Sequence, residues 1–170
     1  MDTDSHFRLL NEWEKNKHQG QQDRKAFLES LASKDVAKVS EMAHSFHKEV
    51  FEEVDCLKCA NCCKTTPPIY TNKDVKRIAA FLGTTPKQFK RKYTIEDVNG
   101  ELVGIKVPCS FLLADNMCSI YEVRPFACRT YPHTDDPAFA ERPELNHNNT
   151  MVCPAAYLIV ERLRSAVITD

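Results

Sequence analysis

The segment CLKCANCC, residues 56–63, contains four cysteines within eight positions. Two-residue spacers let the backbone curl, so that successive thiolates can converge on one ion or cluster. Ferredoxin-type iron–sulfur sites use this step twice in a row and add a remote cysteine that is followed by proline. Here Cys56, Cys59 and Cys62 supply the double step, and Cys153 before Pro154 supplies the remote cysteine. The segment therefore predicts a fold organised around a cysteine-bound metal.

The chain has eight cysteines among its 170 residues. An even number could form disulfides, but nothing in the sequence marks the chain for an oxidising compartment, where disulfides persist. A chain of this length also needs no cross-links to hold a core. Metal ligation is therefore the favoured interpretation. The candidate metal ligands are Cys56, Cys59, Cys62, Cys63, Cys109, Cys118, Cys128 and Cys153.

The spacing of the cysteines also bears on the metal. Zinc ribbons usually pair two C-x-x-C knuckles, and the later cysteines of this chain stand too far apart to form a second knuckle. The spacing therefore favours an iron–sulfur cluster, of the 4Fe–4S type, and zinc is the alternative. The sequence leaves both possibilities open.

The number of centres is a further question, because Cys62 and Cys63 are adjacent. Neighbouring side chains leave the backbone in different directions, so both rarely bind one centre. A single four-cysteine centre with spare thiols is one possibility, and two centres are the other. The two-centre partition assigns Cys56, Cys59, Cys62 and Cys153 to one centre and Cys63, Cys109, Cys118 and Cys128 to the second.

Basic residues stand close to the cysteines in the sequence. Four thiolates around a dication leave a net charge of about −2, which is costly to bury unless it is offset. Lys58, Lys64, Arg124 and Arg129 could offset it, or they could be solvated surface charges.

Three short motifs carry most of the cysteines and follow one another along the chain. They are Cys56-x-x-Cys59-x-x-Cys62-Cys63, Pro108-Cys109-Ser110-Phe111-Leu112, and Cys118-Ser119-Ile120-Tyr121-Glu122-Val123-Arg124-Pro125-x-x-Cys128-Arg129-x-Tyr131-Pro132. This ordered set resembles the YkgJ-type cysteine-cluster family, whose members are described as zinc- or iron-chelating or as containing an iron–sulfur cluster. The resemblance covers about residues 55–133, with Cys153 included, and it implies a metal centre.

Two details qualify the resemblance. Family members commonly carry glycine after the second cysteine, where this chain has Ala60. A similar cysteine motif occurs in flagellin lysine N-methylases, which are larger proteins, so the resemblance also raises the possibility of a modification enzyme. No glycine loop for S-adenosylmethionine is visible, which weakens that possibility.

Composition points to an ordinary globular protein. Hydrophobic residues make up 42% of the chain, charged residues make up 28%, and the net charge is −1. The four glycines cannot form a G-x-G-x-x-G or P-loop motif, which excludes those phosphate-binding sites. No apolar run approaches the roughly 20 residues of a membrane helix, and the N-terminus MDTDSHFRLL lacks the layout of a secretory signal. We expect a cytoplasmic protein without membrane contact.

The chain is expected to form a single domain over residues 1–170, of the α+β class and mainly helical. Residues 1–55 would form an N-terminal helical arm, in which 8 Lys and Arg against 12 Asp and Glu give a net charge of −4. Residues 56–135 would form the cysteine-cluster core. Residues 136–170 would form a polar loop and a C-terminal helix. Helices and a small β-hairpin would pack around the metal.

Start signals place several helices. Apolar residues at helical spacing predict helices through the arm, with a break at residues 33–35. Thr71 and Asp74 form a capping-box-like start for a helix that ends at Gly83. Thr85 and Pro86 start another, with Phe89 and Tyr93 facing inward.

Turn signals place the remaining elements. Asn99-Gly100 predicts a β-hairpin between residues 93–98 and 101–107. A strand pair that turns at Asp115-Asn116 would bring the thiols of Cys109 and Cys118 to one end. Arg124-Pro125 would start a short helix carrying Cys128, and Pro132 to Thr150 would be a polar loop. Pro154 would start the last helix and place Cys153 at its N-terminus, where a thiolate is stabilised.

Other candidate sites are weaker. His44 and His47 share a helix face, but a solvated face is the favoured interpretation. His133 or His147 could replace a cysteine as a ligand, which would favour zinc or a Rieske-like site. Residues 73–92 are basic, yet the net charge argues against nucleic-acid binding.

The favoured function is that of a metal-binding protein in redox, metal-handling or structural use, with an unknown redox or protein partner. The alternatives are a metal-dependent modification enzyme and a zinc-stabilised adaptor that binds nucleic acid or protein. No Ser-His-Asp arrangement or paired-carboxylate spacing is evident, and the sequence leaves open whether the protein is an enzyme.

Overall fold

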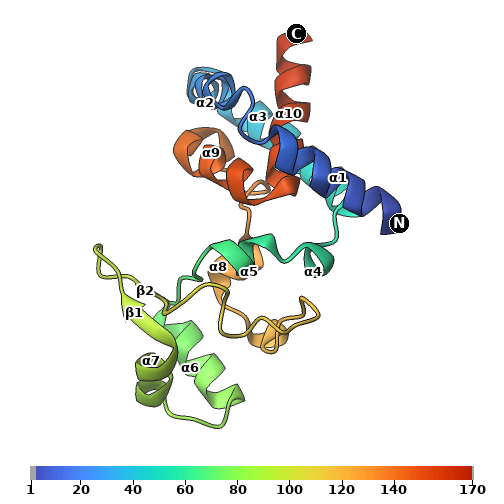
Figure 1. Ribbon diagram of the computed structural model, residues 1–170. Helices are drawn as coiled ribbons and strands as arrows, with labels where there is room; N and C mark the ends of the chain where they lie inside the picture. The colour runs from blue at the N-terminus through green and yellow to red at the C-terminus, as the bar shows by residue number, and fades with distance from the viewer. Residues whose placement is uncertain (1–2, 170) are drawn as a thin grey trace. The chain divides into compact units, whose positions relative to one another are not determined.

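The computed structural model describes residues 3–169 (Figure 1). It is mainly helical with one two-stranded antiparallel sheet, which confirms the predicted α+β class. The chain divides into two compact units, residues 1–55 with 132–170 and residues 56–131. Each unit has its own apolar cluster. The single domain over residues 1–170 stays a prediction, because compact units of this kind can belong to one domain.

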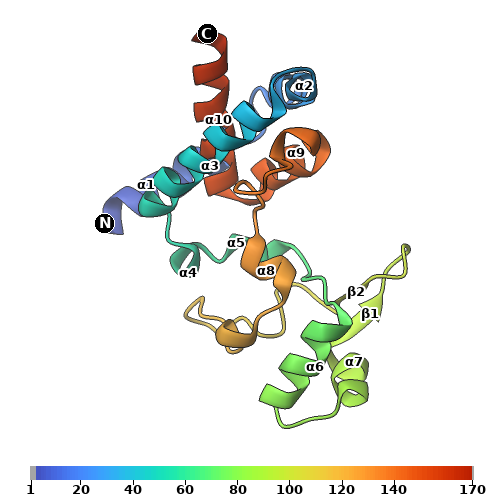
Figure 2. The ribbon, with the colours of Figure 1, turned by 180° about the vertical axis from the view of Figure 1, so that it is seen from behind.

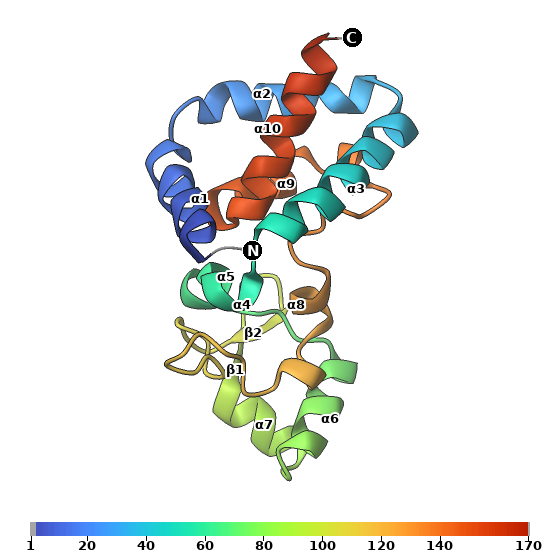
Figure 3. The same cartoon turned by 90° about the vertical axis from the view of Figure 1, so that its right-hand side faces the viewer.

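The unit formed by residues 1–55 and 132–170 consists of helices. They are α1 (Thr3–Asn16), α2 (Gln21–Ser30), the 3-10 turn η1 (Leu31–Ser33), α3 (Val36–Glu53), the 3-10 turn η3 (Phe139–Glu141), α9 (Pro143–Val152) and α10 (Pro154–Thr169). Helix α10 packs against α3 and α9, and α2 packs against α9 (Figure 3). The predicted break at residues 33–35 is confirmed. There the carboxylate of Asp35 accepts the Lys38 N–H at 3.1 Å and caps α3.

The core of this unit joins apolar side chains from five of its elements. The buried members are Leu28, Leu31, Val39, Ala43, Phe139, Ala140, Val160 and Leu163. Beside this core, the buried Arg24 guanidinium bonds to Thr150 Oγ1 at 3.3 Å and to Glu161 Oε1 at 3.2 Å. The indole N–H of Trp13 donates to the carbonyl of Thr150 at 2.9 Å. Thr150 on α9 therefore connects to both α1 and α2.

The predicted polar loop over residues 132–150 is wrong for residues 143–152, which form α9. Pro143 at the first turn and Glu144 beside it are helix-start signals. The helix was missed because its buried face is polar and shows no apolar periodicity. That face consists of Asn146, Asn149 and Thr150. The Asn146 amide donates to the Phe139 carbonyl at 2.6 Å and the Asn149 amide donates to the Pro132 carbonyl at 2.8 Å.

The unit formed by residues 56–131 combines short helices with the sheet. Its elements are α4 (Cys56–Cys59), α5 (Asn61–Thr65), α6 (Asn72–Phe81), α7 (Pro86–Tyr93), β1 (Thr94–Glu96), β2 (Leu102–Gly104), the 3-10 turn η2 (Tyr121–Val123) and α8 (Phe126–Thr130). Helices α6 and α7 pack against each other, and β1 continues from α7 (Figures 1 and 2). Their shared apolar cluster contains Tyr70, Val75, Ile78, Ala79, Phe89, Phe111 and Ile120.

The two predicted helix starts in this unit are confirmed. Both α6 and α7 begin with a full capping box, Thr71 with Asp74 and Thr85 with Gln88. Phe89 is buried and Tyr93 is half-buried, as their inward orientation predicted.

The predicted β-hairpin is present with a different turn. Strands β1 and β2 pair Thr94 with Gly104 and Glu96 with Leu102, and they are shorter than the runs expected from the sequence. Gly100 has φ 76° and donates its N–H to the Asp97 carbonyl at 3.0 Å, whereas Asn99 keeps a negative φ. The loop is therefore a three-residue connection over residues 98–100 with glycine in the left-handed position, not a two-residue Asn-Gly turn.

The strand pair expected between residues 111 and 120 is reduced to a single antiparallel bridge, Leu112 with Cys118. Its turn lies where predicted, since Leu113 donates to the Met117 carbonyl at 2.8 Å and Asn116 adopts φ 69°. The helix predicted to carry Cys128 is confirmed as α8. None of the helices within residues 3–169 has the length and apolar character needed to cross a membrane.

Candidate metal centre

The first cysteines lie on two very short helices separated by one unusual residue. Helix α4 holds Cys56 and Cys59, and α5 holds Cys62 and Cys63. Between them, Ala60 adopts the left-handed conformation with φ 49° and is buried. A left-handed residue at this point ends one turn and starts the next, which is how the two-residue spacers are accommodated.

Four cysteines from separate segments of this unit lie near one another. Cys63 comes from α5, Cys109 and Cys118 flank the 111–117 turn, and Cys128 comes from α8. The N–H of Cys109 donates to the Cys63 carbonyl at 2.8 Å, which ties the 108–112 segment to α5. This set is the four-cysteine group, and it matches the second of the two centres considered from the sequence.

The thiols of the four-cysteine group influence one another electrostatically in every pair. Cys63 and Cys118 raise the pKa of Cys109, and Cys63 also raises the pKa of Cys118. The pKa of Cys128 is raised by Cys63, Cys109 and Cys118. In Cys109, Cys118 and Cys128, burial is the larger cause of the raised pKa. Without a metal, the group favours protonated thiols.

Cys63 and Cys62 interact directly. A hydrogen bond between their side chains is the largest cause of the raised pKa of Cys63, followed by burial. The expectation that adjacent cysteine side chains diverge is therefore not met, and Cys62 lies beside the four-cysteine group. Cys63 also acts on Cys59, whose pKa is raised first of all by burial.

Backbone N–H groups point at the thiols, as thiolate ligands require. The backbone N–H groups of Phe111 and Leu112 lower the pKa of the Cys109 thiol, and that of Ile120 lowers the pKa of the Cys118 thiol, each against the larger effect of burial. The Leu112 N–H itself donates to the Cys109 carbonyl at 3.0 Å. Donors to sulfur are one of the means by which proteins stabilise thiolate-bound metals.

Two of the four cations considered from the sequence act on the thiols. Lys64 lowers the pKa of Cys59 and Cys63, and Arg124 lowers that of Cys118 and Cys128. Arg129 instead donates from Nε to the Arg124 carbonyl at 3.0 Å. Positive charge is therefore present on both sides of the group.

An apolar wall backs two of the four thiols. Cys109 and Cys118 pack against the buried cluster that contains Tyr70 and Phe111. Burial and the nearby thiols Cys109, Cys128 and Cys118 raise the pKa of the Tyr70 hydroxyl. Tyr70 thus places a phenol beside the group. No sequence pattern predicts it, because Tyr70 precedes α6 and reaches the cysteines only through tertiary packing.

A pair of charged residues on α6 reaches the segment that carries Cys128. The carboxylate of Asp74, which is 1% exposed, accepts the Phe126 N–H at 3.1 Å and bonds to Arg77 at 2.5 Å. The same Arg77 donates to the Arg124 carbonyl at 2.8 Å. The sequence identified Asp74 as a cap for its own helix, but not this second contact.

The donor set fits a thiolate-bound metal in chemistry, since it offers four thiols, backbone donors and nearby cations. Within residues 3–169, however, no three His, Cys, Asp or Glu side chains are already arranged to hold one metal ion. All eight cysteines lie in this described range and none forms a disulfide.

The remaining candidate ligands lie elsewhere. Cys153 belongs to the unit of residues 1–55 and 132–170, where it is buried at the N-terminus of α10 and its Sγ accepts the Ala156 N–H at 3.5 Å. This confirms its predicted place at a helix start. His44, His47, His133 and His147 belong to the same unit. His47 shares a 2.8 Å hydrogen bond with Thr134, and burial lowers its pKa against the effect of Asp135.

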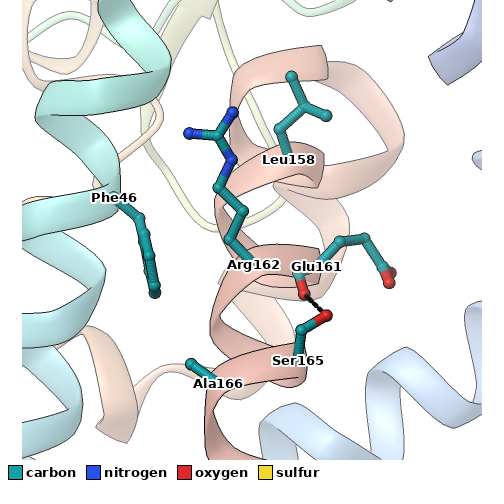
Figure 4. Close-up of a pocket in the computed structure, with 6 residues that line it drawn as sticks. All are labelled: Phe46, Leu158, Glu161, Arg162, Ser165 and Ala166. Carbon is teal, nitrogen blue, oxygen red and sulfur yellow. Dashed lines mark hydrogen bonds between the residues drawn. The ribbon is translucent and has the colours of Figure 1, made fainter.

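A shallow depression of about 520 Å³ lies in that unit and contains no cysteine (Figure 4). Phe46 on α3 faces Leu158 and Arg162 on α10 across it. Arg162 is already bonded to Glu53 at 2.6 Å. The depression is therefore not part of the candidate centre.

The comparison with family models agrees with the cysteine geometry. The model named CxxCxxCC, described as "Putative zinc- or iron-chelating domain", matches residues 55–154. The chain belongs to the CxxCxxCC family. The match confirms the resemblance found in the sequence and supports metal binding, either of zinc or of iron, by this region. Neither the curated proteins nor the solved structures contain a significant match.

The CxxCxxCC region spans the whole unit of residues 56–131 and extends to Cys153-Pro154. It therefore includes all eight cysteines, including the four-cysteine group.

Proposed function

We propose that this CxxCxxCC protein holds one metal centre through Cys63, Cys109, Cys118 and Cys128. The observation that carries the proposal is that three separate segments of one compact unit bring these cysteines together. The Cys109 N–H donates to the Cys63 carbonyl at 2.8 Å, and Leu112 pairs with Cys118. All three of these thiols raise the pKa of Cys128. Scattered structural cysteines have no reason to meet in this way. The family assignment independently supports the coarser statement that this region binds zinc or iron.

The centre we favour is a 4Fe–4S cluster. The support is the spacing of its four ligands, which include no C-x-x-C pair of the kind that zinc ribbons use. A bound cluster would supply one-electron redox chemistry, whereas zinc in an all-cysteine site would be structural. Lys64 and Arg124 would offset the negative charge of the thiolates. We expect the protein to act in redox chemistry or metal handling in the cytoplasm, with a protein partner.

Anaerobic purification followed by metal and acid-labile sulfide analysis tests the proposal. We expect iron with sulfide and a brown colour. Zinc without sulfide would keep the four-cysteine centre but replace the cluster by a structural ion. Protein that binds neither metal under reducing conditions would contradict the proposal.

Two cysteine variants separate the possible ligand sets. Cys128→Ser should lose most of the bound metal because it removes a ligand of the proposed centre. Cys153→Ser changes a buried thiol of the other unit and keeps a helix-capping side chain. If it keeps its metal, no bound metal depends on Cys153, which argues against a centre formed by Cys56, Cys59, Cys62 and Cys153. A loss of about half the metal, with the spectrum of the remaining centre unchanged, would instead support Cys56, Cys59, Cys62 and Cys153 as a second centre.

A further inference from the structure

Asp74 makes more contacts than a helix cap needs. Its carboxylate accepts the N–H and the hydroxyl of Thr71 at 2.9 and 2.6 Å, which completes the capping box of α6. It also accepts the Phe126 N–H at 3.1 Å and bonds to Arg77 at 2.5 Å. One buried carboxylate thus joins the start of α6 to the start of α8.

Arg77 extends this connection. Its Nε donates to the Val123 carbonyl at 3.4 Å and its Nη2 donates to the Arg124 carbonyl at 2.8 Å. Together, Asp74 and Arg77 fix three backbone positions of the chain between η2 and α8. Cys128 follows two residues after the last of them.

The other side-chain bonds that α8 makes to the preceding chain are local, since Arg129 donates to the Arg124 and Glu122 carbonyls at 3.0 and 3.3 Å. Helix α8 has five residues, none of them buried, and Phe126 is 62% exposed. Its N-cap is Pro125, which provides no side-chain cap. Helices this short are not stable by themselves in water. The position of Cys128 therefore depends on the Asp74–Arg77 anchor.

The second capping box of the unit shows what capping alone requires. In α7, Gln88 Oε1 accepts the N–H and the hydroxyl of Thr85, both at 2.9 Å. These contacts are exposed and local to the start of α7. A neutral amide is sufficient there, so the charge and the burial of Asp74 serve a contact beyond its own helix.

We propose that Asp74, assisted by Arg77, is a positioning residue for the metal centre that holds α8 so that Cys128 stays beside Cys63, Cys109 and Cys118. This inference rests on the proposed function. It adds a requirement that the cysteines alone do not show, namely that a carboxylate remote from the thiols controls metal affinity.

The test compares Asp74→Ala and Asp74→Asn with the control Gln88→Ala, which disrupts the matched capping box. Reduced, metal-free protein is titrated with Co²⁺, whose thiolate charge-transfer absorption reports sulfur ligation. The same metal-free proteins are alkylated with iodoacetamide, and the rate at Cys128 is compared with the rates at Cys109 and Cys118 by peptide mass spectrometry.

We expect Asp74→Ala to weaken Co²⁺ binding by about 10- to 100-fold, as for other residues that orient metal ligands. Its charge-transfer absorption should fall, and Cys128 should be alkylated faster relative to the other two thiols. Asp74→Asn keeps an acceptor for the Phe126 N–H and should be intermediate. Gln88→Ala should match the wild-type protein in both assays.

The outcomes are distinguishable. If wild type binds Co²⁺ through thiolates and both Asp74 variants do so equally, with unchanged Cys128 reactivity, the positioning role is wrong. If wild type shows no thiolate binding at all, the proposed function fails, and the alkylation rates still decide whether Asp74 holds α8. Should Asp74→Ala not fold, Asp74→Asn carries the comparison, and wild-type behaviour of that variant would overturn the inference.

Discussion

Ala60 holds the turn between α4 and α5 in a backbone conformation that most residues avoid. Its φ of 49° lies in the left-handed region, which costs an L-residue with a side chain about 1–2 kcal/mol. Glycine, which the family resemblance leads one to expect after the second cysteine, has no such cost. The chain retains a methyl group there that is 4% exposed, so packing offsets part of the strain.

Replacing Ala60 by glycine should therefore not destabilise the fold. We expect Ala60→Gly to change the free energy of unfolding by between zero and about +1 kcal/mol, because relief of the left-handed strain outweighs the entropy of glycine in the unfolded chain. Ala79, also buried but in the regular helix α6, is the control. Ala79→Gly should lower the free energy by about 1 kcal/mol or more. Urea unfolding at fixed metal content measures both, and an equal loss in the two variants would contradict the strain at Ala60.

The Asp74 carboxyl makes the free energy of unfolding depend on pH in the acidic range. Burial acts to raise its pKa, but bonds from Thr71, Arg77 and Phe126 outweigh burial and hold the pKa below the ordinary 3.8. A group whose pKa is lowered on folding stabilises the protein above the pKa of the unfolded chain, and this stability is lost as the pH falls through the folded pKa.

Asp74→Asn should reveal that dependence. At neutral pH the variant should be less stable than wild type by about 1–3 kcal/mol. The gap should shrink as the pH falls below about 4, because the unfolded wild-type chain then takes up a proton that the folded carboxylate resists, and it should close once the folded carboxyl is protonated as well. Urea unfolding of reduced, metal-free protein at a series of pH values measures it, with Asp35→Asn, which removes the charge from a single exposed cap bond, as the control. A gap that stays constant down to about pH 3 would show that the charge of Asp74 does not contribute.

At the scale of elements, a buried polar side chain stabilises α9 more than an apolar side chain on the same helix does. Asn149 is buried and its amide holds the Pro132 carbonyl, whereas Leu145 is 38% exposed. Asn149→Ala should lower the free energy of unfolding by about 1–3 kcal/mol because a buried carbonyl loses its donor. Leu145→Ala should cost less than about 1 kcal/mol. Thermal or urea unfolding of the two variants checks this, and a larger effect from the leucine would mean that α9 is held by apolar contacts after all.

The same element marks the boundary of what the sequence can predict. Helices α6 and α7 were predictable because their Thr caps and apolar faces are local signals. Helix α9 was not, because Asn146 and Asn149 look like surface residues until their partners Phe139 and Pro132 are known. The β-hairpin was predictable only in part. Asn99-Gly100 predicted its position, but in the observed strand register only Gly100 lies in the left-handed region, so the turn differs from the predicted one.

The candidate site divides in the same way. The turn at Asp115-Asn116 predicted that Cys109 and Cys118 would lie together, and one of the two partitions grouped them with Cys63 and Cys128. No local sequence signal distinguishes the two partitions, because the distinction depends on the hydrogen bond from the Cys109 N–H to the Cys63 carbonyl and on the position of α8. Tyr70 and Arg77 could not be predicted, since each reaches its partners only through packing.

At the scale of the whole molecule, charge is distributed unevenly between the two units. Residues 56–131 contain 12 Lys and Arg and 6 Asp and Glu, which gives +6, and the other residues contain 11 against 18, which gives −7. A four-thiolate centre leaves about two negative charges on a dication or a doubly positive cluster. The centre would therefore lie in the unit whose excess charge is opposite to its own.

The two units should also differ in their dependence on metal. The core of residues 1–55 and 132–170 is closed by apolar side chains, among them Leu28, Phe139 and Leu163. The core of residues 56–131 packs directly against Cys109 and Cys118, whose thiols would be metal ligands. Since metal binding to such a site contributes directly to folding free energy, removing the metal should loosen the second unit first.

Hydrogen exchange of the metal-loaded protein before and after treatment with a chelator under reducing conditions measures this difference. We expect amides of α6, α7 and α8 to lose protection by at least about tenfold, equivalent to about 1.4 kcal/mol, while amides of α3 and α10 keep theirs. Cys128→Ser should reproduce the effect without a chelator. An equal loss in α3 and α10 would mean that the metal stabilises the chain as one cooperative unit. Unchanged protection in α6 to α8, despite complete removal of the metal, would mean that this unit folds without the centre.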